Sequence, residues 1–330
     1  KLFRKTDQAK ILQQVMASVN DPLKRVKSNL LGLPNSQSEY LSKLLRHVLD
    51  TPGKKIRPSV TLLSASFHPN DGKAVEIMAS AVELLHLATL IHDDTVDNSD
   101  VRRGKGTVSN LWGDNAAVLL GDYVFATSAK FVCDTGNIRV IRRFSETIME
   151  LSSGELNEME HSYNFALTRE EYMSRIYNKT ASLFTTAAET GAVLSGATEK
   201  TVQALKGYGY NLGMAFQIVD DILDFQGDSE EIGKPIGNDL AQGVLTLPAI
   251  ISLENYPTNN PILDLSSTSS TKDELAHVVS LISESDVIPE SYAVAAEYCT
   301  RALEHLTGLD NNSARESLGL LVDYMGIRTK

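Results

Sequence analysis

Residues 83–94 read ELLHLATLIHDD and residues 212–225 read LGMAFQIVDDILDF, two apolar runs in which acidic residues follow hydrophobic ones. Hydrophobic residues recur in both runs every three or four positions, a period that predicts helices with one buried face. Because positions i and i+4 lie on the same helix face, acidic residues at that spacing are expected to point the same way. Each run leads into a cluster with the spacing DDxxD, formed by Asp93, Asp94 and Asp97 and by Asp220, Asp221 and Asp224.

These clusters favour a metal site over a solvated acidic surface. Acidic runs on helices are often solvated faces, and one cluster alone would leave that interpretation open. Here two clusters of identical spacing follow core-type helices, where ionised carboxylates are costly unless they are paired or bind a metal. Carboxylate oxygens suit Mg²⁺, which protein and phosphorylated substrate often share. The pair therefore predicts a magnesium site for a polyphosphate substrate.

The composition is that of a globular protein and excludes some functions. Of 330 residues, 42% are hydrophobic and 22% charged, and the net charge of −11 argues against nucleic-acid binding. Cys133 and Cys299 are isolated, so we expect core thiols and neither a zinc site nor a disulfide framework. No run of 18 or more apolar residues occurs, so no membrane-spanning helix is expected. A cytoplasmic location is expected, or an organelle if a targeting segment preceded Lys1.

Helical periodicity continues through the chain, and strand-type alternation is absent. Thr168 followed by Glu171 fits a capping box at a helix start. We therefore expect one all-α domain over residues 1–330. The expected helices span residues 7–30, 36–50, 56–67, 71–98, 112–134, 138–164, 168–195, 199–226, 244–254, 271–285, 289–307 and 312–326.

Basic residues accompany both acidic clusters, as a polyphosphate site requires. A lone Lys or Arg is usually a surface cation, but several of them beside acidic clusters favour an anion site. The stretch GKKIRP (53–58) is expected to open a helix, whose free N–H groups could also bind phosphate. The candidate residues are Lys54, Arg57, Arg102, Arg103, Lys179, Thr180 and Lys234.

Through these stretches the chain resembles the trans-prenyltransferases, or isoprenyl diphosphate synthases, and among them the medium- and long-chain polyprenyl diphosphate synthases. The resemblance implies an antiparallel helix bundle of the isoprenoid synthase type around a central cavity. It also implies a homodimer, with the N-terminal helices (residues 1–50) as candidates for its interface. The matching stretches are GKKIRP (53–58), ELLHLATLIHDDTVDNSDVRRG (83–104), AAVLLGDYVFA (116–126), KTASLF (179–184), MAFQIVDDILDFQGD (214–228) and GKPIGNDLAQGVLTLP (233–248).

The activity that the resemblance implies is the condensation of isopentenyl diphosphate with geranyl, farnesyl or geranylgeranyl diphosphate. The allylic C–O bond ionises, the isopentenyl double bond attacks the cation, and loss of a proton leaves an all-trans product one unit longer. The six aspartates Asp93, Asp94, Asp97, Asp220, Asp221 and Asp224 would bind three Mg²⁺ on the allylic diphosphate. Arg102, Lys179, Thr180, Gln217 and Lys234 would lie at the same diphosphate, with Lys179 contributing to catalysis, and Lys54, Arg57, His86 and Arg103 would bind isopentenyl diphosphate.

Two positions depart from the pattern of the family. Many members carry Lys at the position of Val244, so one diphosphate contact is missing here or supplied elsewhere. Glu158 stands where Gln is common, with a consequence that the sequence leaves open.

Product length is predicted from the residues one turn before the first cluster. Short-chain members place bulky aromatic residues there, whereas this chain has Ala88 and Thr89, which would leave a tunnel open. Phe144 is a candidate for the tunnel floor. We expect a product of about six or more isoprene units, about C30 or longer, because an open apolar tunnel favours elongation. A C20 or C25 product stays an alternative, as does a role for Ala88 in close packing only.

Two other classes compete with an elongating transferase. A non-catalytic subunit of a heteromeric prenyl synthase would be favoured by degraded aspartate clusters, and both clusters are intact here. A terpene cyclase or head-to-head condensing enzyme would generally lack both clusters together with GKKIRP. A polyprenyl product dissolves in membranes, so we expect at most transient membrane association and no nucleic-acid partner.

Overall fold

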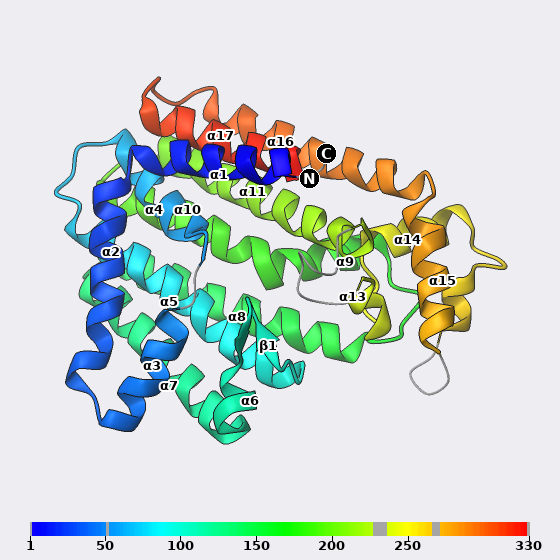
Figure 1. Cartoon of the computed structure of the whole chain (residues 1–330). Coiled ribbons are helices and arrows are strands. Elements are labelled where there is room, and N and C mark those ends of the chain that lie inside the picture. The colour runs from blue at the N-terminus through cyan, green and yellow to red at the C-terminus, as the bar shows by residue number, and fades with distance from the viewer. Residues whose placement is uncertain (1, 51–52, 227–235, 266–270, 329–330) are drawn as a thin grey trace. The chain divides into compact units, whose positions relative to one another are not determined.

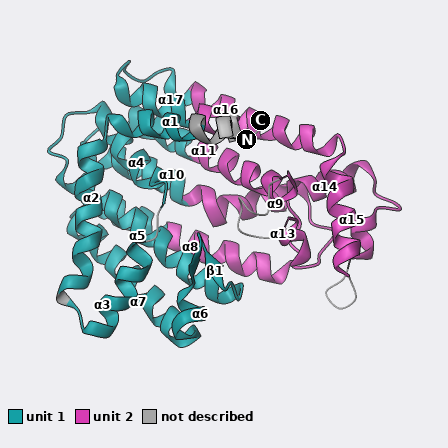
Figure 2. Ribbon diagram, in the orientation of Figure 1, with its two compact units in different colours: residues 1–146, 183–209, 305–321 teal, residues 147–182, 210–304, 322–330 magenta. Residues whose placement is uncertain are grey.

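The structure is a computed structural model that describes residues 2–50, 53–226, 236–265 and 271–328. Within these residues the regular secondary structure is helical apart from one short hairpin, so the all-α prediction is confirmed (Figure 1). The chain divides into two compact units (Figure 2). Unit 1 comprises residues 1–146, 183–209 and 305–321, and unit 2 comprises residues 147–182, 210–304 and 322–330. One domain over residues 1–330, with both aspartate clusters at one cavity, stays a prediction.

The expected helices are present in order with small shifts at their ends, except that the segments 7–30 and 168–195 are each divided and that the short helices at 108–112 and 238–241 were not expected. The helices of the structure are α1 Leu2–Ala17, α2 Asn20–Gly32, α3 Glu39–Leu49, α4 Ile56–Ser64, α5 Lys73–Val96, α6 Val108–Trp112, α7 Asp114–Asp134, α8 Ile138–Glu160, α9 Arg169–Ile176, α10 Ser182–Ser195, α11 Glu199–Gln226, α13 Asn238–Ala241, α14 Leu247–Asn255, α15 Lys272–Ser283, α16 Val287–Leu306 and α17 Ser313–Arg328. Shorter elements are η1 Leu33–Ser36, η2 Ala65–Phe67, the π-helical turn η3 Tyr177–Ala181, η4 Pro261–Asp264, and strands β1 Val101–Arg102 and β2 Lys105–Gly106.

Unit 1 is built around α5, which packs against α2, α4 and α7. Met78, Val82 and Leu85 of α5 are buried with 0–1% exposure. A second contact, between α4 and α10, depends on a glycine: a Cβ at Gly191 would lie 2.2 Å from the carbonyl oxygen of Thr61. Because that neighbour is backbone and cannot rotate away, only glycine permits the two helices to approach so closely.

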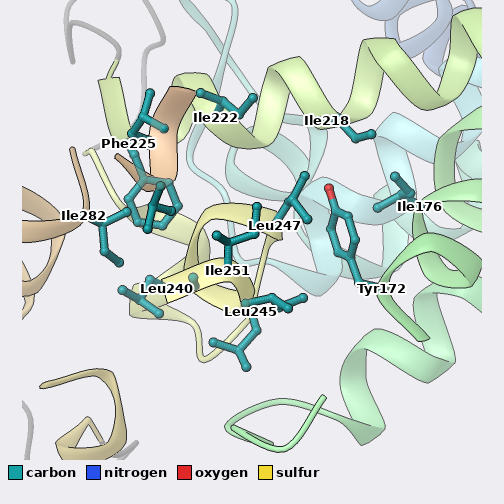
Figure 3. Packing of buried hydrophobic residues seen from close by; sticks show 14 of the residues in the cluster. Tyr172, Ile176, Ile218, Ile222, Phe225, Leu240, Leu245, Leu247, Ile251 and Ile282 are labelled. Atoms are coloured by element: carbon teal, nitrogen blue, oxygen red, sulfur yellow. The ribbon is translucent and has the colours of Figure 1, made fainter. Parts of the chain in front are cut away.

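Unit 2 has its own apolar core (Figure 3), to which α9, α13, α14, α15, α16 and the second half of α11 contribute. Ile218 and Ile222 lie one turn apart on α11, as a helical period requires, and both are fully buried. The ring of Tyr172 on α9 points toward α11 from within this core. The core therefore presses α9 against the segment of α11 that carries the second aspartate cluster.

Several local expectations were wrong. The helix predicted over residues 7–30 is broken between α1 and α2, because Pro22 has no N–H to donate to the carbonyl oxygen of residue 18. A two-stranded hairpin, which alternation did not indicate, pairs Val101 with Gly106. Cys133 is exposed and Cys299 only partly buried, so neither is a core thiol.

In the part of the chain that the structure describes, two helices, α5 and α7, are long and apolar enough to cross a membrane by length and composition alone. A count of uninterrupted apolar residues had excluded both, because each contains a few polar positions. Buried core helices pass the same test, and 56% of the apolar window of α5 is buried within the protein. The corresponding fraction for α7 is 33%, which leaves an apolar face of that helix exposed.

Candidate active site

A pocket in unit 1 lies between the C-terminal half of α5, the end of α3 and the β1–β2 hairpin. Apolar side chains of α5, among them Leu84, Leu87 and Ile91, line much of it. Polar and charged side chains, among them His86 and Asp94, line the remainder. The pocket can therefore hold a small molecule that has a hydrocarbon part and a charged part.

The first aspartate cluster ends α5 at this pocket. Asp94 is buried with 7% exposure, and its Oδ1 accepts a hydrogen bond from Arg102 Nε at 2.6 Å. Asp93 is partly exposed, and Asp97, the C-cap residue of α5, is exposed. The two carboxylates that share a helix face thus keep access to solvent, while the third is held by an arginine.

The β1–β2 hairpin positions two arginines beside the cluster. Its turn residues Arg103 and Gly104 both have positive φ, 51° and 77°, as expected for the tight two-residue turn that matches strand twist. His47 Nε2 on α3 donates to the carbonyl oxygen of Gly106 at 2.8 Å and ties the hairpin to α3. Arg102 and Arg103 are therefore set by a constrained turn and by a contact outside the hairpin.

Basic side chains crowd around His86. Arg57 Nη1 lies 3.4 Å from His86 Nε2, and the Lys55 ammonium pairs with Glu83 Oε1 at 2.7 Å. Burial lowers the pKa of His86 well below its ordinary 6.5, and the nearby cations lower it further. These cations are Arg57, Arg103, Arg102 and Lys55. Since like charges repel at such range, this end of the pocket favours an anion.

The loop before α4 places its two lysines differently. Lys55 lines the pocket, whereas Lys54 is exposed. Lys55 is also the N-cap residue of α4, in the left-handed region with φ 51°. The sequence prediction named Lys54 and missed Lys55, because the backbone conformation that separates them is not visible in the spacing.

The second aspartate cluster lies on α11 in unit 2 and is tied into a chain of hydrogen bonds. Thr180 Oγ1 donates to Gln217 Oε1 at 2.6 Å, and Gln217 Nε2 donates to Asp221 Oδ1 at 2.7 Å. The fully buried Tyr172 donates its hydroxyl to Asp221 Oδ2 at 2.6 Å. As in the first cluster, the second aspartate is buried, and here it accepts hydrogen bonds from the neutral side chains of Tyr172 and Gln217.

Further carboxylates gather beside Asp221. Asp224 accepts hydrogen bonds from the backbone N–H groups of Asn238 and Asp239 at 3.3 and 3.2 Å. Burial raises the pKa of Asp221 to about 7, and burial together with Asp224 and Asp221 raises that of Asp239 to about 8. Carboxylates that raise one another's pKa destabilise their own ionised forms, which a bound cation would relieve.

These carboxylates fit a divalent cation that is shared with a substrate. In the described residues, no three His, Cys, Asp or Glu side chains converge on a complete metal site. Mg²⁺ does not need one, since it usually takes one or two carboxylates and fills its remaining positions with water and phosphate oxygens. The donor set, oxygen only and acidic, matches that requirement.

Lys179 lies on the π-helical turn η3, a type of distortion that is frequent at functional sites. Its Nζ contacts Glu158 Oε1 on α8 at 2.6 Å and Glu155 Oε1 at 3.2 Å. The other carboxylate oxygen of Glu158 lies 3.8 Å from Nε of the buried Arg175. Arg175 also donates to the carbonyl oxygen of Leu245, the residue after Val244. A cation thus lies near the position where the family often has lysine.

The predicted chain-length residues all lie in unit 1. Ala88 is 1% exposed and Phe144 is 2% exposed, so both are packed inside the unit. Thr89 Oγ1 donates to the carbonyl oxygen of His86 at 2.9 Å. A tunnel along Ala88 stays a prediction.

Besides Lys55, three side chains in unit 2 were missed from the sequence: Tyr172, Arg175 and Asp239. Asp239 lies inside the matching stretch 233–248, so that match was an available signal. Tyr172 and Arg175 lie in a helix whose pattern resembles any amphipathic segment, so nothing local marks them. Lys234, which was predicted from the same stretch, lies outside the described residues.

Comparison with known proteins agrees with this description. Residues 38–282 match the family model described as polyprenyl synthetase. The chain is 36% identical over 310 residues to heptaprenyl diphosphate synthase component 2 of Bacillus subtilis, and the alignment covers 94% of this chain and 89% of that protein. It is similar to the crystal structure of heptaprenyl diphosphate synthase from Staphylococcus aureus, with a TM-score of 0.91, 34% identity, and coverage of 94% and 98%. It is also similar to polyprenyl synthase from Caulobacter crescentus complexed with calcium and isoprenyl diphosphate, with a TM-score of 0.89, 30% identity, and coverage of 95% and 97%.

Proposed function

This chain belongs to the polyprenyl synthetase family, and we propose that it is a Mg²⁺-dependent trans-polyprenyl diphosphate synthase. It condenses isopentenyl diphosphate with an allylic diphosphate and makes a product of about C30 or longer, as the heptaprenyl synthases among its relatives indicate. The observation that carries the proposal is the pocket of unit 1, where basic side chains surround His86 at one end of an apolar lining.

In unit 1 the charged end of the pocket binds the diphosphate of isopentenyl diphosphate. Lys55 and Arg103 supply charge, and His86, whose pKa is lowered by burial and then by its cationic neighbours, adds a hydrogen bond without adding repulsion. Leu87 and Ile91 enclose the five-carbon part and keep water from it. Lys54 and Arg57, which were predicted for this role, lie in the loop before α4 and in its first turn.

In unit 2 the residues around Asp221 bind the allylic diphosphate. Lys179 contributes positive charge, and Thr180 and Gln217 orient Asp221 through their hydrogen bonds. Mg²⁺, when bound by the aspartates, would neutralise the charge that develops on the departing diphosphate. A divalent ion accompanies isoprenyl diphosphate in the Caulobacter crescentus relative. Three Mg²⁺ per active site belong to this proposal.

The assembly proposed is a homodimer that uses α7. Val118 and Leu119 on this helix are 44% and 68% exposed, and large apolar side chains at a helix surface favour contact with another protein. The name of the Bacillus subtilis relative, component 2, supports a second candidate, a catalytic subunit that needs a different partner chain.

The test is a product assay. The purified chain, with Mg²⁺, receives labelled isopentenyl diphosphate together with geranyl, farnesyl or geranylgeranyl diphosphate, and its products are separated by length. Products of about C30 or longer are expected, and Asp94→Asn and Asp221→Asn should reduce their formation by at least about a hundredfold. Products that end at C20 or C25 would contradict the long-chain proposal. Activity that needs another chain would favour the heteromeric candidate.

A further inference from the structure

Glu158 lies between two cations of unit 2. One of its carboxylate oxygens is 2.6 Å from Lys179 Nζ, and the other is 3.8 Å from Arg175 Nε. Its side chain is 20% exposed, and that of Lys179 is 31% exposed. Partial burial weakens solvent screening, so the short contact is stronger than a typical surface ion pair.

The backbone sets this contact. A Cβ at Gly154 would lie 2.9 Å from the backbone nitrogen of Lys179, so glycine lets α8 approach η3 closely. Glu158 lies four residues after Gly154 and therefore on the same face of α8. On the other side, Arg175 is buried and bound to the carbonyl oxygen of Leu245. Glu158 thus meets cations whose own backbone positions are fixed.

The Lys179–Glu158 pair borders the acidic group around the second aspartate cluster. Glu158 is among the carboxylates that raise the pKa of Asp239, and Lys179 lowers it. An anion that binds next to the Lys179–Glu158 pair lies between the acidic residues of the second cluster and the Lys179 ammonium. To reach that ammonium at hydrogen-bonding distance, it must compete with a carboxylate that is already 2.6 Å away.

We propose that Glu158 is a positioning residue that holds Lys179 beside the second aspartate cluster, and that an incoming diphosphate displaces it from the Lys179 ammonium. The inference rests on the proposed function, because it takes Lys179 as a diphosphate ligand. Binding breaks the ion pair between Glu158 and Lys179, so the diphosphate binds more weakly than it would if Glu158 did not contact Lys179. When the diphosphate product leaves, the ion pair between Glu158 and the Lys179 ammonium forms again, which favours its departure.

The experiment measures binding of inorganic pyrophosphate to the full chain by titration calorimetry at saturating Mg²⁺. Glu158→Gln keeps the size of the side chain and removes its charge, so pyrophosphate should bind about tenfold more tightly. Glu155→Gln is the matched control, since Glu155 lies on the same helix, contacts Lys179 at the longer distance of 3.2 Å and is 35% exposed. It should change the affinity less than about twofold.

The same titration in a Lys179→Gln background tests whether competition is the cause. Adding Glu158→Gln there should give no gain, because no ammonium remains for the two anions to share. Weaker pyrophosphate binding by Glu158→Gln would overturn the inference. So would a gain in affinity that persists without Lys179, because it would reflect general charge repulsion.

If Lys179→Gln alone leaves pyrophosphate affinity unchanged, the proposed diphosphate role of Lys179 fails. If Lys179→Gln weakens binding and Glu158→Gln has no effect, only the inference fails. Melting temperatures of all variants check that they are folded.

Discussion

Replacing Tyr172 by Phe removes one oxygen atom from the interior of unit 2. That hydroxyl is fully buried and donates to Asp221 Oδ2 at 2.6 Å. Burial raises the pKa of Asp221 from its ordinary 3.8 to about 7, while the hydrogen bonds from Tyr172 and Gln217 lower it. Without the hydroxyl, the pKa of Asp221 rises further, because the ionised form loses a donor.

The magnitude of the effect depends on pH. The pKa of Asp221 is higher in the folded chain than in the unfolded chain, so stability falls as pH rises through the window from about 4 to about 7. The bond from Tyr172 offsets part of that loss only when Asp221 is ionised. We expect Tyr172→Phe to lower the free energy of unfolding by about 2 kcal/mol at pH 8, as for a hydrogen bond to a charged group, and by about 1 kcal/mol at pH 6.

The assay is urea unfolding at both pH values in the presence of a chelator, followed by Mg²⁺ titration of activity. Tyr208→Phe is the matched control, because Tyr208 is also fully buried but donates to a neutral acceptor, the carbonyl oxygen of Leu318, at 2.8 Å. Tyr208→Phe should lower the free energy of unfolding by about 1 kcal/mol at both pH values and should leave the Mg²⁺ concentration needed for activity unchanged. Tyr172→Phe should need about tenfold more Mg²⁺, since metal binding requires an ionised carboxylate. Equal effects of the two substitutions on the Mg²⁺ requirement would refute the reasoning.

Three further predictions concern other parts of the two units. Ala88→Phe should shorten the product, because a bulky ring would fill the space predicted along α5; an unchanged product distribution would reject that tunnel. The unfolded chain protonates His86 near its ordinary pKa of 6.5 while the folded chain does not, so stability falls as pH drops below 6.5. When the pH is lowered from 7.5 to 5.5, the free energy of unfolding, measured with urea, should fall by about 1 kcal/mol more for the native chain than for His86→Gln. If the free energies of both chains change equally with pH, His86 makes no such contribution. Gly154→Ala should lower the melting temperature, since its Cβ would meet the backbone nitrogen of Lys179 at 2.9 Å, whereas Gly319→Ala, whose Cβ would have nothing within 4 Å, should leave the melting temperature unchanged.

Local pattern was a good guide to helices and a poor guide to their interruptions. The long periodic runs became α5 and α11 with ends within two residues of the prediction. The break before α2, the π-helical turn at Lys179 and the β1–β2 hairpin were missed. Each depends on backbone hydrogen bonds or turn geometry at one or two residues, which a period of three or four positions averages away.

By itself the amino-acid order established an all-helical chain with two equally spaced acidic clusters, attendant cations and membership of a prenyl-transferring family. Those features are local, since helical period and motif spacing involve residues within a few turns of one another. Only the tertiary structure decided which lysine of the loop before α4 lines the pocket, that Tyr172 binds Asp221, and that Glu158 binds Lys179. The last two pairs join residues 49 and 21 positions apart. Contacts of that kind follow from how helices pack, and helix packing depends on the volumes and shapes of whole faces, which no single stretch of sequence contains.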